Sequence, residues 1–331
     1  DGKALKIKEV PEPQILDTQV LIKVKAVGIC GTDLAIAKGD LATPTPIIIG
    51  HEFSGEVVKV GTNVDKSWLG KRVTSEINTN IDFSCYYCQR GLYTQSISRK
   101  AIGIDINGAL AEFIAVESYL IHKIPRELSF EEATFIEPLA AAYQTFEMMP
   151  LSQDDKNIAI FGLGKLGLLV LQVVRLKGLK IIAIDGSDKK LDLARQFGAD
   201  HLINRFNVSN IPAEIRHLTN NLGADIVLDS TGNPNALNDI IESSKIRGKI
   251  HIKSTHGIET PINLTDIVVR EIILYSSRCG PFELAINGLK SGDIKVRNLI
   301  TDIYSLKDIE SVFSTKKANR DTIKIVVKIE S

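Results

Sequence analysis

Cysteine is scarce in this sequence, with four residues among 331. A small scaffold held by disulfides is therefore excluded, because such scaffolds need many closely spaced cysteines. An excess of charge is also absent, since forty basic residues balance forty acidic ones. Without that excess, no general attraction draws the chain to nucleic acid or to an anionic membrane. The composition favours a small neutral ligand.

Long apolar runs are missing as well. No run approaches the roughly 18 residues of a membrane-spanning helix, and the first residues lack the charged-then-apolar order of a signal peptide. Together with the few cysteines, these absences predict a cytoplasmic protein without a membrane partner. The 331 residues are about twice a usual domain length, so two domains are expected.

The hydrophobic pattern changes along the chain. Residues 19–29 and 53–61 alternate with a period of two, which is typical of β-strands. From residue 157 onward, apolar runs that end in Gly, Ser or Asp alternate with segments of helical spacing, which predicts a parallel sheet covered on both faces. The end of the chain is again β-rich. We therefore predict an α/β protein in which a Rossmann domain, residues 139–277, is inserted into a β-rich domain formed by residues 1–138 and 278–331.

A dinucleotide-binding motif follows the run "IAIF". Gly162, Gly164 and Gly167 form G-x-G-x-x-G between a predicted strand and a predicted helix, and Asp185 ends the next strand. These residues suit a tight turn, a close approach to pyrophosphate, helix packing and binding of the ribose 2′-hydroxyl. Asp185 would repel a 2′-phosphate, so NAD is favoured over NADP, although Lys190 can soften that preference.

Three possible metal ligands lie in the β-rich part. Cys30 is in "VGICGTD", and His51 and Glu52 are in "IIGHEFSGEVV". Thiolate, imidazole and carboxylate together are a plausible open zinc site. Taken singly, each residue is better explained as a buried thiol, a core histidine or a surface charge.

With these motifs in family order, the sequence resembles the zinc-dependent medium-chain dehydrogenases over essentially its whole length. The matching stretches are "GICGTD", "GHEFSGEVVKVG", "FIEPLAAAYQ", "GLGKLG", "DGSDKKLDLARQFGAD" and "VLDSTG". This superfamily contains alcohol, polyol, threonine and sugar dehydrogenases. The resemblance implies a GroES-like catalytic domain beside the Rossmann domain, one catalytic zinc, and NAD or NADP.

The resemblance also assigns roles to single residues. Cys30 and His51 match zinc ligands, and Glu52 matches a glutamate that binds the metal directly or lies behind its ligands. Glu137 stands where the polyol and sugar branch has a glutamate ligand, which favours polyols, sugars or secondary alcohols. Thr32 matches the hydroxyl that takes the substrate proton while zinc lowers the pKa of the alcohol and the nicotinamide accepts hydride. Asp33 matches a carboxylate that orients the histidine.

Further positions match the cofactor site. They are Leu166 and Thr231, Lys253 and Ser254 beside the nicotinamide, and Lys324, which matches a basic residue that reaches the pyrophosphate or is an exposed strand lysine. Many relatives carry a relay histidine where this chain has Ala35. His256 is an alternative route for the proton or a loop residue without a role.

The lobe with four cysteines in the family is depleted here. Its C-x-x-C-x-x-C-x7-C pattern falls on Asp82, Cys85, Cys88 and Ser96. Asp82 could supply an oxygen ligand beside the two thiols, but Ser96 is neutral and a poor ligand, so a tight structural zinc is not expected. Packing or a Cys85–Cys88 link is expected to hold the lobe instead.

The leading hypothesis is a zinc-dependent oxidoreductase that transfers hydride between NAD(P) and an alcohol to give a ketone or aldehyde. Two alternatives stay open: a catalytically silent dinucleotide-binding protein that senses redox state or is structural, and a zinc-free enzyme of the quinone-reductase type. The apolar stretch "EIILYSS" would suit pairing into a homodimer or homotetramer.

Overall fold

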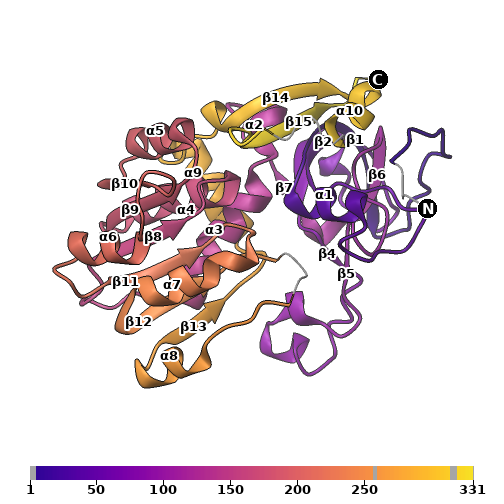
Figure 1. Cartoon of the computed structure of the whole chain (residues 1–331). Helices are drawn as coiled ribbons and strands as arrows, with labels where there is room; N and C mark the ends of the chain where they lie inside the picture. Colours follow the sequence, from indigo (N-terminus) through magenta and orange to yellow (C-terminus); the bar gives the residue numbers. More distant parts are fainter. Residues whose placement is uncertain (1–4, 256–258, 314–318, 331) are drawn as a thin grey trace. The chain divides into compact units, whose positions relative to one another are not determined.

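The computed structural model describes residues 5–255, 259–313 and 319–330 (Figure 1). The chain divides into two compact units. The first comprises Asp1–Glu137, Phe282–Ala318 and Lys324–Ser331, and the second comprises Pro138–Pro281 and Asn319–Ile323. The predicted boundaries lay at 138/139 and 277/278, and the prediction contained no separate short segment for 319–323. In the described ranges, no helix combines the length and hydropathy needed to cross a membrane.

The first unit is built on a seven-stranded sheet in the order β14-β15-β1-β2-β3-β7, with β6 also paired to β1. Its strands are β1 (Gln19–Gly28), β2 (Glu52–Val60), β3 (Arg72–Ser75), β6 (Phe113–Glu117), β7 (Ile121–Lys123), β14 (Ile300–Ser305) and β15 (Lys324–Lys328). The centre is β1, whose apolar residues are buried because β2, β6 and β15 all pair with it. The last strand of the chain therefore completes the sheet that the first strand begins.

Short helices and a lobe complete the first unit. They include α1 (Gly31–Lys38), α2 (Phe130–Ala133), α9 (Phe282–Ser291) and α10 (Ile309–Phe313), together with the start of α3 (Ile136–Met148). Two short strands, β4 (Asn78–Thr79) and β5 (Lys100–Ala101), pair at the base of the lobe. The lobe itself holds only the 3-10 turns Cys88–Arg90 and Tyr93–Gln95.

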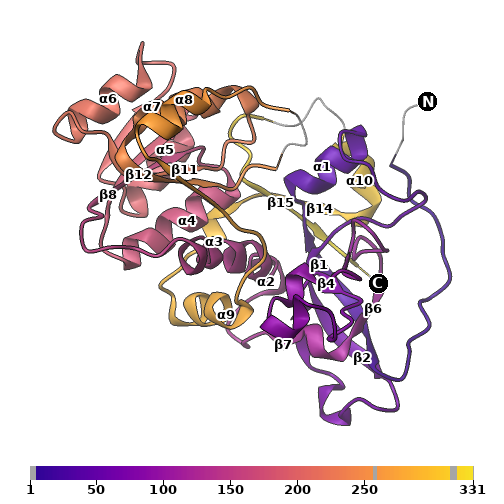
Figure 2. The same cartoon turned by 90° about the horizontal axis from the view of Figure 1, so that it is seen from below.

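The second unit contains a six-stranded sheet whose neighbouring strands are all parallel, in the order β10-β9-β8-β11-β12-β13. The strands are β8 (Asn157–Phe161), β9 (Lys180–Asp185), β10 (His201–Asn204), β11 (Ala224–Asp229), β12 (Ser244–Ile252) and β13 (Ile273–Ser276). The intervening helices are α4 (Lys165–Leu176), α5 (Asp188–Gln196), α6 (Ile211–Leu218), α7 (Leu237–Ser243) and α8 (Leu264–Val269). Figure 2 shows α7 and α8 on one face of this sheet and α4 on the other.

The predicted fold class is confirmed by this architecture. The runs at 157–162, 180–186 and 224–232 form the buried strands β8, β9 and β11, because both faces of a parallel sheet are covered. Strand order reverses between β8 and its neighbour β11, so the ends of these two strands form a switch point. In folds of this kind, ligands bind in the crevice at that point.

Candidate active site

Cys30, His51 and Glu52 converge because β1 and β2 are antiparallel neighbours. Gly28, the last residue of β1, is paired with Glu52, the first residue of β2, so the chain segments on either side of this pair meet. One ligand atom from each of the three residues lies within 4.8 Å of the others. His51 and Glu52 are buried, and Cys30 is partly buried. The sequence-predicted core of a metal site is thus assembled by strand register.

Asp33 links the two segments that carry these residues. It lies in the first turn of α1, and its side chain accepts hydrogen bonds from the backbone N–H of Cys30 at 2.8 Å and of Gly50 at 3.1 Å. One of its oxygens is 3.5 Å from Nδ1 of His51, and the residue has no exposed surface. Burial alone would lower the pKa of His51, but the charge and hydrogen bonding of Asp33, with a contribution from Cys30, raise it well above its usual value.

Glu52 is paired with a lysine from the far end of the chain. Nζ of Lys324, the first residue of β15, donates to Oε2 of Glu52, and both side chains are buried. Burial lowers the pKa of Lys324 to about 7, against the negative charges of Cys30 and Asp33, which raise it. Gly28 leaves the space for this lysine, since a Cβ there would lie 2.1 Å from Nζ. The sequence predicted that Lys324 either reaches the pyrophosphate or is an exposed strand lysine. The second prediction is wrong, because the side chain is buried and its ammonium contacts Glu52.

Three further predicted site positions lie outside this group of possible metal ligands. Oγ1 of Thr32, on α1, is 3.8 Å from Sγ of Cys30. Glu137 is buried in the first turn of α3, and it is not a member of the three-residue group within 4.8 Å among the described residues. His256 lies outside the described residues.

The donor set fits a catalytic zinc. Zinc takes thiolate, imidazole and carboxylate ligands, and its catalytic sites use about three of them and leave one position open. Here the three donors are of those types, one imidazole nitrogen faces a buried carboxylate, and the nearby ammonium offsets the charge of Glu52. These features would hold the ligands in place for the metal.

The glycine motif of the second unit has the shape that each glycine was predicted to provide. Gly162 has φ +87, and a Cβ there would lie 2.8 Å from the backbone oxygen of Ser230. A Cβ on Gly167 would lie 2.0 Å from the backbone oxygen of Gly162, so only glycine lets α4 start this close to β8. Gly164, which caps α4, has open space where a Cβ would be. An approaching pyrophosphate would find this space and the helix N-terminus.

Asp185 ends β9 next to this motif. Its oxygens accept hydrogen bonds from the backbone N–H groups of Leu163 at 2.7 Å, Gly186 at 2.8 Å and Ser187 at 2.9 Å. The carboxylate is therefore fixed at the carboxyl end of the sheet. Ser187 in turn donates to Asp321 at 2.6 Å, which ties the segment Asn319–Ile323 to this turn.

The remaining cofactor candidates are Leu166, Lys190, Thr231, Ser254 and Lys253. Leu166 lies partly buried in the first turn of α4, and Lys190 is partly buried on α5. The hydroxyl of Thr231 donates to Asp229 at 2.8 Å, and Oγ of Ser254 accepts from Gly232 N at 2.9 Å. Sequence reasoning placed the Lys253 side chain beside the nicotinamide, but its Nζ donates to the carbonyls of Ala141 at 2.8 Å and Ser277 at 3.1 Å.

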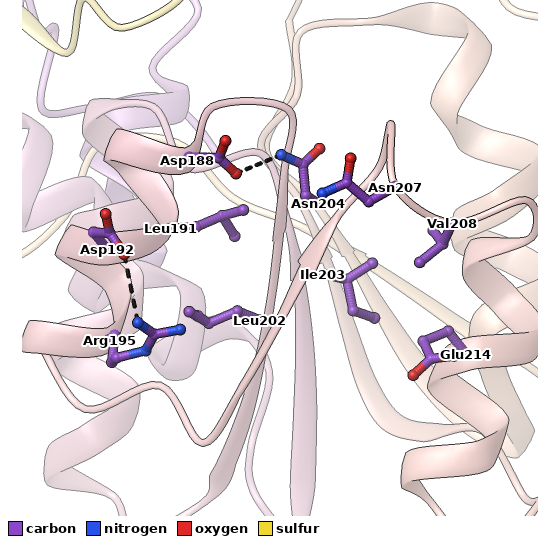
Figure 3. Close-up of a pocket in the computed structure, with 10 residues that line it drawn as sticks. All are labelled: Asp188, Leu191, Asp192, Arg195, Leu202, Ile203, Asn204, Asn207, Val208 and Glu214. Atoms are coloured by element: carbon purple, nitrogen blue, oxygen red, sulfur yellow. Dashed lines mark hydrogen bonds and ion pairs between the residues drawn. The ribbon is translucent and has the colours of Figure 1, made fainter.

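A pocket of about 380 Å³ lies along the edge strand β10, between α5 and α6 (Figure 3). Asn204 donates to Asp188 at 2.6 Å across its rim, and Asp192 pairs with Arg195 at 3.5 Å on its α5 side. Asn204 is the register partner of Asp185, so the rim adjoins the end of β9. None of the predicted site residues lines this pocket.

Comparison with known proteins finds a family model for each of the two units. Residues 16–126 match the family model of the alcohol dehydrogenase GroES-like domain, and residues 166–289 match the zinc-binding dehydrogenase model. The chain is 32% identical to D-arabitol-phosphate dehydrogenase of Enterococcus avium over 323 residues, which covers 96% of this chain and 91% of the relative. The chain belongs to the zinc-dependent medium-chain dehydrogenase superfamily.

Two further members of the superfamily are similar over nearly their full length. Sorbitol dehydrogenase of Bacillus subtilis is 32% identical, with 93% of this chain and 89% of that protein covered. The crystal structure of 2R,3R-butanediol dehydrogenase from Bacillus subtilis has a TM-score of 0.86 and 29% identity, and covers 98% of this chain and 96% of that one. The predicted GroES-like and Rossmann combination is thereby confirmed.

Replacing Asp33 by Asn should weaken zinc binding by about 10- to 100-fold, because the uncharged amide no longer accepts both backbone hydrogen bonds or orients His51. Zinc affinity, measured by competition with a chromogenic chelator, tests this. Asp40→Asn, at an exposed position just after α1, is the matched control and should leave the affinity unchanged. Equal affinities for wild type and Asp33→Asn would contradict the assigned role.

The two glycines Gly164 and Gly167 should respond differently to alanine. In Gly164→Ala the added methyl group enters open space, so the free energy of unfolding measured in urea should change by only about 0.5 kcal/mol. The affinity for NAD should fall at least about tenfold, because the methyl group lies where the pyrophosphate would approach. Gly167→Ala forces a methyl group against Gly162 and should destabilise the protein by about 1–3 kcal/mol. Urea unfolding and NAD titration of both variants check this, and similar losses of stability would refute it.

Proposed function

We propose that this chain oxidises the secondary hydroxyl of a polyol, a sugar or another secondary alcohol, with NAD as the preferred cofactor and one catalytic zinc. Its family makes it an NAD(P)-dependent alcohol dehydrogenase. The observation that carries the finer proposal is the convergence of Cys30, His51 and Glu52 within 4.8 Å at a buried carboxylate, Asp33. The glutamate at position 137 and the polyol dehydrogenases among the relatives support the substrate class.

The residues of the first unit would have different roles in metal binding and proton transfer. When bound, zinc would act as a Lewis acid on the substrate hydroxyl, and NAD would accept the hydride. Cys30 and His51 would hold the metal, with Glu137 and Glu52 as the remaining candidate ligands. Asp33 fixes the orientation of His51, and Lys324 offsets the charge of Glu52. The hydroxyl of Thr32, 3.8 Å from the Cys30 thiol, would take the substrate proton.

NAD is preferred over NADP in this proposal because of Asp185. Its carboxylate is fixed by three backbone N–H groups at the end of β9, where the adenosine ribose binds in Rossmann domains. A 2′-phosphate would bring a second negative charge to this carboxylate. Lys190 on α5 is near in sequence and would reduce that penalty without removing it.

Zinc analysis and NAD reduction together test the proposal. Purified wild type should contain about one zinc per chain and reduce NAD faster than NADP with at least one polyol, sugar or secondary alcohol. Cys30→Ala should lose the zinc and the activity, whereas the matched control Cys85→Ala should keep both. Protein that binds NAD but contains no zinc and oxidises no alcohol would favour the silent dinucleotide-binding alternative.

We further propose that two copies associate through the edge strand β13. Ile273 and Leu274 on this strand are 49% and 41% exposed, and the neighbouring α8 exposes Leu264, Val268 and Val269. An exposed apolar edge strand is a template for pairing with another strand, and a two-fold axis would join two β13 strands into one continuous sheet.

The cytoplasmic location remains a prediction from composition.

The oligomeric state tests this interface. Wild type should sediment as a dimer or tetramer, and Ile273→Lys should shift the equilibrium towards the monomer, because a lysine on an edge strand opposes pairing. Ile303→Lys, at an equally exposed position on β14, is the control and should sediment like wild type. A monomeric wild type, or two variants with the same behaviour, would remove the proposed interface.

A further inference from the structure

The lobe between β4 and β5 contains two of the three cysteines that the active site does not use. Residues 80–99 connect β4 to β5, which pair as a separate two-stranded sheet, and Figure 1 shows this segment in purple. Cys85 is partly buried, and Cys88 is 4% exposed at the start of a 3-10 turn. Asp82 and Ser96 occupy the other two positions of the family pattern.

Asp82 organises this lobe through four hydrogen bonds. One carboxylate oxygen accepts from the backbone N–H of Ser84 at 2.8 Å and of Cys85 at 2.7 Å. The other accepts from the hydroxyls of Ser96 at 2.9 Å and Ser98 at 3.1 Å. These donors, the two N–H groups foremost, hold the pKa of Asp82 well below its usual value.

This arrangement does not fit a structural zinc. A structural site needs about four charged or imidazole ligands, and a carboxylate has about four lone-pair positions for all its partners. The ligand atoms of Asp82, Cys85 and Cys88 lie within 4.8 Å of one another, but Asp82 already accepts several hydrogen bonds. Ser96, in the fourth position, supplies only a neutral hydroxyl that donates to Asp82. The remaining anionic donors are two thiols. A carboxylate-centred network of hydrogen bonds thus replaces the metal as the organiser of the lobe.

The two thiols lie next to each other, and Cys85 donates a hydrogen bond to Cys88 without a disulfide between them. Sγ of Cys85 lies 3.5 Å from Sγ of Cys88, in contact but not linked. A disulfide requires a separation of about 2.05 Å, which side-chain rotation within a C-x-x-C turn can provide. The next acceptor for the Cys85 thiol is the hydroxyl of Ser96 at 3.9 Å, which is a weaker partner.

We propose that Cys85 and Cys88 form a reversible dithiol–disulfide modification site, with a low-molecular-weight disulfide such as oxidised glutathione as the oxidant. The Cys85 thiolate attacks the glutathione disulfide and displaces one glutathione thiolate, giving a mixed disulfide on Cys85. The Cys88 thiolate then attacks Sγ of Cys85 and displaces the second glutathione. Two electrons pass from the protein sulfurs to glutathione, whose two thiolates take up the two protons.

The surroundings of the two sulfurs indicate that Cys85 is the attacking thiol and Cys88 the resolving thiol. Partial burial would raise the pKa of Cys85, but the N–H groups of Cys88 and Ile97 and the Cys88 thiol lower it below its usual value. Burial raises the pKa of Cys88. Cys85 is also the more exposed of the two, and its neighbours Tyr86 and Tyr87 lie at the surface, so an oxidant reaches Cys85 first. Cys88, behind it, is the resolving thiol.

Thiol counting and peptide mass spectrometry test this site independently of alcohol oxidation. Wild type, as purified with its metal, is incubated with oxidised glutathione, alkylated and digested. Two of the four thiols should be lost, the peptide with Cys85 and Cys88 should be lighter by two hydrogens, and dithiothreitol should restore both thiols. Cys30 and Cys279 should stay reduced and should therefore be found alkylated after digestion. Cys279→Ser is the matched control and should give the same Cys85–Cys88 product.

The single-cysteine variants separate the two roles. Cys88→Ser should accumulate a stable glutathione adduct on Cys85, while Cys85→Ser should react at least tenfold more slowly. A wild type that keeps both thiols, or that stops at the glutathione adduct, would overturn the proposal. A second zinc that is lost in Cys85→Ala would overturn it as well, because the thiols would then be metal ligands. These readouts are independent of the proposed function, since none of them measures alcohol oxidation.

Discussion

A single buried carboxylate, Asp33, holds the catalytic part of the molecule together. It caps its own helix through the N–H of Cys30 and reaches across to the N–H of Gly50, so it fastens both loops that carry candidate ligands. An ionised group without exposed surface is costly unless every lone pair finds a donor. Two backbone amides provide such donors here, and Nδ1 of His51 faces the same carboxylate at 3.5 Å, so Asp33 ties the position of Cys30 to that of His51.

Among the described residues, the first unit contains two clusters in which three possible metal ligands lie within 4.8 Å of one another. Around Cys30, the carboxylate of Glu52 meets one ammonium, from Lys324, and a thiol and an imidazole lie within 4.8 Å. Around Cys85, the carboxylate of Asp82 accepts hydrogen bonds from two backbone N–H groups and from the hydroxyl of Ser96. The two clusters also differ in donor type, because an imidazole lies beside Cys30 and a second thiol lies beside Cys85.

The sequence predicted what depends on local pattern. The buried strands of the second unit and the three glycines follow from periodicity and turn chemistry, and the grouping of Cys30 with His51 and Glu52 follows from the family resemblance. It did not predict the short edge strand β10, because "HLIN" is too brief to show a period. The contacts of Lys324 and Lys253 also escaped prediction, since their partners lie far away in the chain and only tertiary packing brings them together.

The position of β15 has a consequence for the order of folding. This strand pairs with β1 between residues 26–28 and 326–328, so the sheet of the first unit closes only after nearly the whole chain is available. In sequence, the residues of the second unit come after β1 and before β15, so this unit can fold earlier during synthesis. Contacts of such long sequence separation carry a large loop-closure cost and form slowly. Until Lys324 arrives, Glu52 lacks its counter-charge, so a nascent chain would acquire its metal-binding geometry as one of its last steps.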